Sequence, residues 1–256
     1  LTAAERDAIV REQLYVQPSR GKLGLVREAP HFVSWITEQL SAEERRRGGR
    51  VQTTLDLPLQ HRCEALVRDH TTELAARGVG QAGVVVLDAQ TGEVRAMVGS
   101  RDYTEARVGM INILTTPRNP GSALKPFTYA EALERGDSPS SLAADITDGE
   151  ANHNADGREH GPVRYAVALP SSYNLAALDV ARRVGPDRLL RRLRQAGLQT
   201  LDREAEAYGA ELTLGSGKVK LVDLAAAYRF LVHGGEVIAA HGITAVRPAG
   251  ESLVAR

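Results

Sequence analysis

Apolar residues recur along this chain at two different spacings, which separate the predicted helices from the predicted strands. Apolar positions three and four residues apart are typical of a helix with one buried face. This spacing predicts helices over residues 1–13, 31–40, 58–77, 122–135, 163–169, 173–184, 186–196 and 219–231. In the 58–77 helix the predicted buried face carries Leu59, Cys63, Leu66, Val67, His70 and Leu74.

Short β-prone runs interrupt these helices. Residues 51–55 form one run, and residues 83–88 and 93–98 form two more, separated by a turn that ends at Gly92. Gly92 can adopt the positive φ that a tight hairpin turn requires. Antiparallel strands flanked by helices predict a layered α+β domain.

Polar segments lie between the predicted elements. Residues 17–24 are rich in Pro, Gly and basic side chains, which is typical of a connector, and the charge run over 43–50 predicts an exposed linker. The polar residues 146–162 predict a long surface loop, and long loops in compact domains are often functional. We expect the loop histidines His153 and His160 to be solvated.

Composition bounds the possible functions. The 256 residues are 43% hydrophobic and 25% charged, which is enough for a packed core. Lys+Arg (32) equals Asp+Glu (32), so net charge gives no reason to expect nucleic acid as a partner. The single cysteine, Cys63, excludes an intrachain disulfide and a cysteine-based zinc site, and we expect it to be an inert core thiol.

Ser122 and Lys125 are the most informative pair for chemistry. They lie three residues apart on a predicted helix, where their side chains share one face. A serine hydroxyl is a poor nucleophile until a base removes its proton, and a lysine amine is such a base only when neutral. The apolar neighbours Leu124 and Phe127 favour the burial that keeps an amine neutral. Pro126 places Ser122 near the first turn, where free N–H groups stabilise a developing oxyanion.

A second polar group follows at Ser172-Tyr173-Asn174, where another helix is predicted to begin. A serine hydroxyl can pass a proton between a base and a leaving group, and an asparagine amide can both donate and accept. Ser and Asn are also preferred helix caps, so capping is the alternative explanation of this triplet. Either group alone is weak evidence, and the two together are stronger.

Together the two groups resemble the S-x-x-K and S-x-N signature of penicillin-binding proteins and serine β-lactamases. Longer blocks extend the resemblance: VQTTLDLPLQ (51–60), VVLDAQTGEVRAMVGS (85–100), PGSALKPFTYAEALERG (120–136), HGPVRYAVALPSSYNLAAL (160–178) and LGSGKVKLVDLAAAYRFLVHGG (214–235). They are similar to consecutive blocks of the transpeptidase domain of a class A penicillin-binding protein, and VGSRD and HGP are most similar to the 1C type. APHFVSWITEQL (29–40) resembles the connector that precedes this domain.

The resemblance implies a division of the chain and a cellular setting. Residues 1–50 would be a connector, and residues 51–256 a transpeptidase domain that lacks its C-terminal part. That fold is α+β, with an antiparallel sheet flanked by helices. The expected partners are stem peptides ending in D-Ala-D-Ala, β-lactam antibiotics and other cell-wall synthesis proteins. We expect the protein to act in the periplasm or on the outer face of the cell membrane, with any membrane anchor outside this chain.

The resemblance also implies a mechanism without cofactor or metal. Ser122 attacks the D-Ala-D-Ala bond to form an acyl-enzyme, and Lys125 acts as the base. Ser172 relays the proton to the departing D-Ala, and Asn174 orients Lys125 and the substrate amide. Tyr173 and Gly121 belong to the implied substrate-binding set. An amine of a second stem peptide then takes the acyl group, whereas β-lactams acylate Ser122.

The sequence departs from this family at its third motif, Lys-Thr/Ser-Gly, which binds the substrate carboxylate. Neither Thr-Gly nor Ser-Gly follows any of the four lysines, Lys22, Lys125, Lys218 and Lys220. Loss of an oxyanion donor costs about 10²–10³-fold in rate, so we expect these residues alone to form a poor or inactive transpeptidase. Two alternatives stay open: a non-catalytic relic or scaffold of cell-wall synthesis, and a relative that hydrolyses or senses β-lactams.

Overall fold

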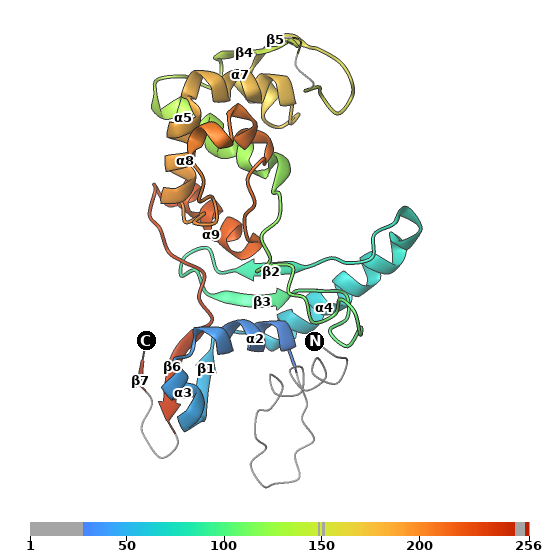
Figure 1. Cartoon of the computed structure of the whole chain (residues 1–256), viewed down its shortest axis with the longest axis vertical. Helices are drawn as coiled ribbons and strands as arrows, with labels where there is room; N and C mark the ends of the chain where they lie inside the picture. Colours follow the sequence, from blue (N-terminus) through green and yellow to red (C-terminus); the bar gives the residue numbers. More distant parts are fainter. Residues whose placement is uncertain (1–27, 148, 150–151, 249–253, 256) are drawn as a thin grey trace.

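A computed structural model describes residues 28–147, 149, 152–248 and 254–255. The described chain is elongated, with a mainly helical upper part and a lower part that holds the longer strands (Figure 1). The predicted helix over 1–13 and the connector over 17–24 lie outside the described residues. Among the described helices, we find none with the length and apolar character needed to cross a membrane.

Helices make up most of the regular structure. The α-helices are α2 (Pro30–Gln39), α3 (Ala42–Arg47), α4 (Leu57–Glu73), α5 (Lys125–Glu134), α6 (Tyr165–Ala168), α7 (Asn174–Val184), α8 (Pro186–Gln195) and α9 (Leu221–Val232). The 3₁₀ turns are η1 (Ala75–Arg77), η2 (Gly121–Leu124), η3 (Ala205–Ala207) and η4 (Ala210–Leu214). The strands are β1 (Gly49–Thr53), β2 (Val84–Leu87), β3 (Val94–Val98), β4 (Leu142–Asp145), β5 (Gly161–Arg164), β6 (Ile243–Pro248) and β7 (Val254–Ala255).

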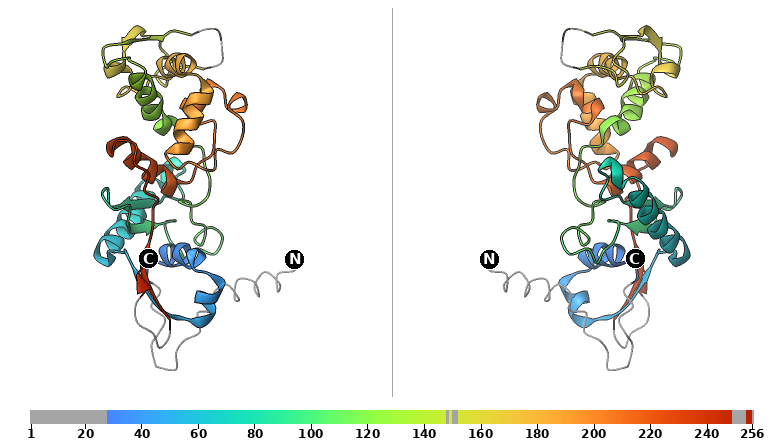
Figure 2. Two further views of the ribbon diagram at one scale, coloured as in Figure 1. Left: turned by 90° about the vertical axis from the view of Figure 1, so that its left-hand side faces the viewer. Right: turned by 90° about the vertical axis from the view of Figure 1, so that its right-hand side faces the viewer.

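In the described part of the chain the strands form three small antiparallel sheets: β1-β6-β7, β2-β3 and β4-β5. In the first sheet Val51 lies opposite Val246, so the two ends of the described chain are hydrogen-bonded together. The side views show red β6 beside blue β1 (Figure 2). The predicted α+β class, with antiparallel strands flanked by helices, is confirmed.

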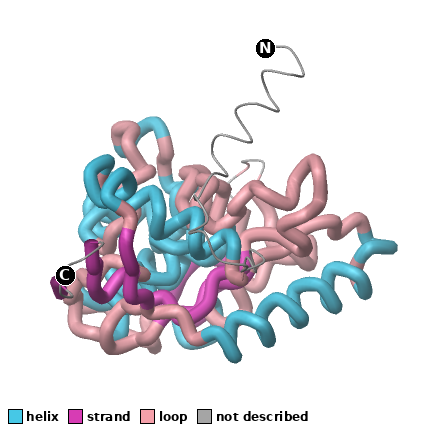
Figure 3. The backbone as a smooth tube through the Cα atoms, turned by 90° about the horizontal axis from the view of Figure 1, so that it is seen from below, coloured by secondary structure: helices cyan, strands magenta, loops and turns pink. Residues whose placement is uncertain are grey.

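The lower part is built around β3, which packs against a helix on each side. Cys63 and Val67 of α4 pack against Ala96 and Val98 of β3. Helix α2 packs against other residues of the same strand. Figure 3 shows α4 running alongside the strands. Gln60 of α4 bonds both the N–H and the C=O of Met97 in β3, at 2.8 and 3.1 Å. The Gln60 amide thus satisfies the backbone groups of Met97, as the backbone of a neighbouring strand would.

This contact rotates α4 away from the predicted orientation. Leu66 and His70 were expected on the buried face and are exposed, whereas Gln60 and Thr71 are buried. A pattern that counts apolar residues misses a polar side chain buried to satisfy backbone groups. Cys63 is buried as predicted, and burial raises the pKa of its thiol.

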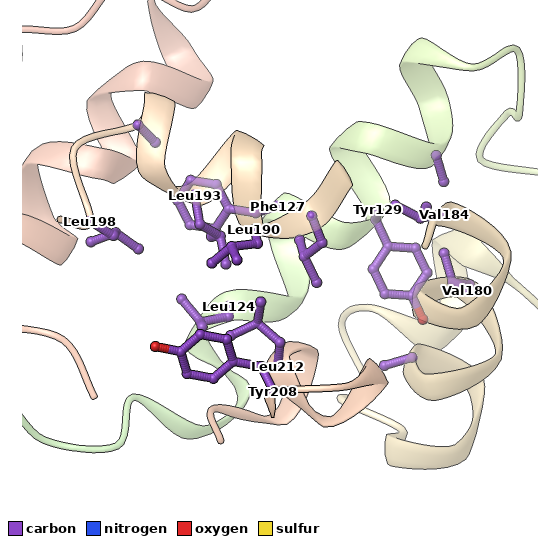
Figure 4. Close-up of a cluster of buried hydrophobic side chains, with 14 of the residues drawn as sticks. Leu124, Phe127, Tyr129, Val180, Val184, Leu190, Leu193, Leu198, Tyr208 and Leu212 are labelled. Carbon is purple, nitrogen blue, oxygen red and sulfur yellow. The ribbon is translucent and has the colours of Figure 1, made fainter. Parts of the chain in front are cut away.

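The upper part holds the largest apolar core, shared by α5, α7, α8 and η4 (Figure 4). Leu124 and Phe127 pack there with Leu193 of α8 and Leu212 of η4, all fully buried. Arg192 of α8 donates to Glu131 of α5 at 2.8 Å and also pairs with Glu134. Apolar packing therefore fixes the start of α5, and the ion pairs fix its C-terminal end.

The turn before α5 is held by a distant segment of the chain. Arg118 and Val219 exchange backbone hydrogen bonds of 2.9 Å in both directions, and Asn119 donates to the carbonyl of Gly215 at 2.8 Å. Gly215 has φ +87°, and a Cβ built on it would lie 2.3 Å from the backbone nitrogen of Gly121. The close approach of these two backbones requires glycine at position 215.

Two other segments differ from the predictions. Residues 43–50 are not an irregular linker: Ser41 and Glu44 form a capping box that starts helix α3, although its residues are mostly exposed as expected. Within the predicted helix over 163–169, residues 163–164 belong to β5 and only α6 is helical. Pairing with β4 closes a hairpin there, which overrides the local helical spacing.

We predict that Gly215→Ala destabilises the fold by at least about 2 kcal/mol, because it adds a backbone clash to the penalty of positive φ. Gly136→Ala is the matched control: φ there is +102°, and no atom lies within 4 Å of the added Cβ, so we expect about 1 kcal/mol. Denaturant unfolding measures both. Equal losses would contradict the close packing at Gly215.

Candidate active site

Ser122 is an exposed residue of the 3₁₀ turn η2, immediately before α5. The predicted helix over 122–135 therefore begins as a 3₁₀ turn and continues as α-helix from Lys125. The carbonyl of Ser122 accepts the N–H of Lys125, and side chains three residues apart on such a turn lie one above the other. Pro126 is the second residue of α5, a position that tolerates proline.

Lys125 is 1% exposed, and the second predicted group surrounds its amine. Its Nζ lies 2.6 Å from the carbonyl oxygen of Ser172, 3.1 Å from Ser172 Oγ and 2.7 Å from Asn174 Oδ1. The structure thus brings Lys125, Ser172 and Asn174 into contact across nearly 50 residues of sequence. The predicted burial of the lysine, beside Leu124 and Phe127, is confirmed.

Burial lowers the pKa of Lys125 to about 8, although the negative charge of Asp145 works in the opposite direction. Removing an ammonium from water disfavours its charged form, and a nearby carboxylate favours it. With such a pKa, about a tenth of the molecules hold a neutral amine at pH 7. A general base is most effective when its pKa lies near the working pH.

The three acceptors around Nζ differ in what they can do once the amine is neutral. The carbonyl of Ser172 and the Oδ1 of Asn174 can only accept, so they take the two remaining amine protons. The lone pair of Nζ can then accept a proton, and the hydroxyl of Ser172 lies close enough to exchange one with the amine. This geometry suits a hydroxyl that exchanges a proton with the lysine.

Ser172 is held in a strained backbone conformation. Its φ of +55° lies in the left-handed region, which costs a non-glycine residue about 1–3 kcal/mol. The N–H of Ser172 donates to Leu169 at 3.0 Å, and the N–H of Tyr173 donates to Ala168 at 3.1 Å. Strain of this kind persists where the surroundings fix the backbone on both sides, and it is common at functional sites.

Helix capping does not explain the Ser-Tyr-Asn triplet. Helix α7 begins at Asn174, and its N-cap is Tyr173, which provides no side-chain cap. Asn174 accepts from Lys125 through Oδ1 and donates from Nδ2 to the carbonyl of His153 at 2.9 Å. Instead, Oδ1 of Asn154 accepts the N–H groups of Asn174 and Leu175, at 2.6 and 3.3 Å.

The two predicted substrate-binding residues lie next to the predicted catalytic residues in the structure. Gly121 has φ +60° and contacts Gly215. The ring of Tyr173 stacks on the imidazole of His160, with centroids 4.0 Å apart and planes 12° from parallel. The prediction that His160 is solvated is wrong, because its side chain is three-quarters buried and bonds to Asp145.

The acidic and histidine side chains near the site pair with one another. Asp145 Oδ2 lies 2.6 Å from Nδ1 of His160, and Asp156 Oδ2 lies 3.2 Å from its Nε2. Within the described ranges we find no group of three or more His, Cys, Asp or Glu side chains arranged to hold a metal ion.

Sequence patterns missed several residues that support the site. Tyr228 of α9 donates its hydroxyl to the carbonyl of Ala123 at 2.8 Å and packs edge-on against Phe127. Asp145 and Asn154 support the start of α7. Gly215 lies in the block 214–235, and its close approach to Gly121 is a tertiary contact that the sequence pattern does not predict.

Comparison with known proteins gives relatives of one kind. Over 191 residues the chain is 37% identical to penicillin-binding protein 1C of Escherichia coli K12, covering 72% of this chain and 24% of that protein. Penicillin-binding protein 1A of Haemophilus influenzae has a similar fold, with a TM-score of 0.75 and 18% identity over 99% of this chain and 52% of that one. PonA1 of Mycobacterium tuberculosis in complex with penicillin V gives a TM-score of 0.69 and 22% identity, over 89% and 63%.

The chain spans about a quarter of the length of its 1C relative. The model of the penicillin binding protein transpeptidase domain matches residues 82–250, which include both serine groups and lie inside the predicted 51–256 domain. Strand β1 crosses the predicted domain boundary at residue 50, and that boundary stays a prediction. The resemblance to class A penicillin-binding proteins is confirmed, and the chain belongs to the penicillin-binding protein transpeptidase domain family.

Proposed function

We propose that this chain carries the acylation site of a peptidoglycan D,D-transpeptidase, with Ser122 as the nucleophile. In the first step Ser122 Oγ bonds to the carbonyl carbon of the penultimate D-Ala, and the peptide bond to the terminal D-Ala breaks. The hydroxyl proton of Ser122 passes to the amine of Lys125. Ser172 then relays a proton from Lys125 to the amine of the departing D-Ala. In the second step an amine of another stem peptide attacks the ester, which frees Ser122 and forms the cross-link.

The contact of a buried Lys125 with both Ser172 and Asn174 carries this proposal. A surface lysine near a serine would hold its proton and could not act as a base at neutral pH. Here burial lowers the pKa of the amine to about 8, and a hydroxyl lies within reach to relay a proton. Ser122 is exposed one turn away, which leaves it open to a substrate.

The proposed substrates and location follow from the family. PonA1, which shares the fold, was seen in complex with penicillin V, and this supports β-lactams as ligands of Ser122. We propose stem peptides ending in D-Ala-D-Ala as substrates, and other cell-wall synthesis proteins as further partners. Because such peptides lie outside the cytoplasmic membrane, we propose that the site works there.

Two other functions stay under test. A non-catalytic relic or scaffold is favoured by the absence of a Lys-Thr-Gly or Lys-Ser-Gly triplet from the 256 residues. A hydrolase or sensor of β-lactams would use the same first steps, and a hydrolase would release the acyl group to water. A slow, stable adduct on Ser122 supports the transpeptidase, no adduct supports the scaffold, and rapid turnover of a chromogenic cephalosporin supports the hydrolase.

We predict that a fluorescent penicillin labels the chain and that Ser122→Ala removes the labelling. The adduct is the ester of Ser122 Oγ, so its loss with the hydroxyl is complete. Ser140→Ala, at another exposed serine, is the matched control and keeps the labelling. Gel fluorescence over hours, with mass spectrometry of the labelled peptide, measures both. An unlabelled wild-type chain, or labelling that survives in Ser122→Ala, would contradict the proposed function.

We also predict that the labelling rate rises with pH. Below the pKa of about 8 the amine of Lys125 is mostly protonated, so each pH unit gained multiplies the neutral fraction about tenfold. Above that pKa the base is already neutral and the rate levels off. Rate constants measured between pH 6 and 9.5 check this. A flat profile, or a rate that still rises tenfold per pH unit up to pH 9.5, would show that Lys125 is not the base with the expected pKa.

A further inference from the structure

Asp145, the last residue of β4, is a buried carboxylate with four hydrogen bonds. It is 0% exposed, although it precedes a polar loop. Oδ1 accepts the N–H of Ala176 at 3.0 Å. Oδ2 accepts Nδ2 of Asn154 at 2.7 Å, and the N–H and ring Nδ1 of His160 at 3.0 and 2.6 Å. Burying a carboxylate is costly unless hydrogen bonds compensate for the lost water. These four hydrogen bonds therefore indicate a structural role that a solvated loop residue would not have.

Through its bonds to Ala176 and Asn154, Asp145 caps the N-terminus of helix α7, although it is not part of that helix. The first N–H groups of a helix have no partner within it, and the N-cap side chain does not satisfy them here. Asn154 accepts two of them, from Asn174 and Leu175, and Asp145 accepts the third, from Ala176. Because Asp145 also holds the amide of Asn154, all three depend on it directly or through one neighbour.

Through its bond to His160, Asp145 also helps to fix Tyr173, the residue between Ser172 and Asn174. Its bond to Nδ1 orients the imidazole of His160, and that ring stacks on Tyr173. The backbone of Ser172, strained at φ +55°, is thus bounded by a fixed aromatic ring on its C-terminal side. The loop between β4 and β5 is tied to the start of α7 at both His160 and Asn154.

We propose that Asp145 is a positioning residue for the reaction: its hydrogen bonds hold Ser172 and Asn174 in contact with Lys125, and its negative charge acts on the buried amine. The proposal rests on the proposed function, since it concerns how that site is built. Asp145 is fully buried and acts through other residues, so it is not a catalytic residue.

The negative charge of Asp145 should change the pH–rate profile, an effect that a purely structural residue would not have. The negative charge of Asp145 raises the pKa of Lys125, against the larger effect of burial. Other titratable groups lie near Asp145. His160 on the hairpin also meets Asp156, and on α7 the ion pair of Asp179 and Arg183 lies beside Ala144. Burial raises the pKa of Tyr129 on α5, and the charge of Asp145 adds to this effect. Removing this charge lowers the pKa of Lys125, so the acid side of the pH–rate profile moves to lower pH.

The test compares three variants by fluorescent-penicillin labelling between pH 6 and 9.5. Asp145→Asn is expected to lower the plateau rate about 10²-fold through misplacement of Ser172 and Asn174, and to shift the profile to lower pH. Asn154→Ala loses the acceptor for two N–H groups but keeps the charge, so its plateau falls and its profile stays. Asp223→Asn, at a half-buried carboxylate on α9 that faces Lys220, is the control and changes neither.

Failure of the proposal can be separated from failure of the proposed function. If the wild type is not labelled, the function fails, and the titration of Lys125 followed by NMR of lysine-labelled protein still decides the proposal, with a lower pKa expected in Asp145→Asn. If the wild type is labelled but Asp145→Asn keeps both its plateau and its profile, the positioning role is overturned. If circular dichroism finds Asp145→Asn unfolded, Asn154→Ala decides: an unchanged plateau rejects the proposal, and a reduced one supports it.

Discussion

The upper part of this structure depends on one constraint, which is that an amine at the start of α5 must be buried and still satisfied. Lys125 is 1% exposed, and its Nζ finds all three acceptors on residues 172 and 174. An amine buried without such partners would cost several kcal/mol. The position of helix α7 helps to satisfy the amine, since its first residue, Asn174, supplies one acceptor and Ser172, two residues earlier, supplies the other two.

Two opposing effects set the basicity of this amine. Burial disfavours the ammonium, and the charge of Asp145 favours it. The balance leaves the pKa at about 8, closer to neutral pH than to the ordinary value of 10.5. The same carboxylate organises the hydrogen bonds that hold the acceptors in place. Geometry and basicity are thus coupled through one buried group.

The helices could be predicted from the sequence, and so could the polar residues that meet around Lys125. Helical spacing depends on burial of one face, which α7 and α8 follow closely, and the proposed acylation chemistry limits the residue types that can serve it. Polar residues buried by tertiary contacts could not be predicted. Asp145, Asn154 and Gln60 lie in segments that look solvated or amphipathic, and their burial follows from backbone groups far away in sequence. The three-sheet arrangement was missed for a similar reason, because β1 pairs with the distant β6.

The most direct test of this account is the titration of the Lys125 amine itself. The chain has only four lysines, so selective isotope labelling and NMR, with Lys125→Arg for assignment, can follow this amine from pH 6 to 11. The account predicts one lysine that loses its proton near pH 8, well before the others. A Lys125 that titrates near 10.5 with the other lysines would mean that the amine stays charged at neutral pH, and the proposed base would be lost.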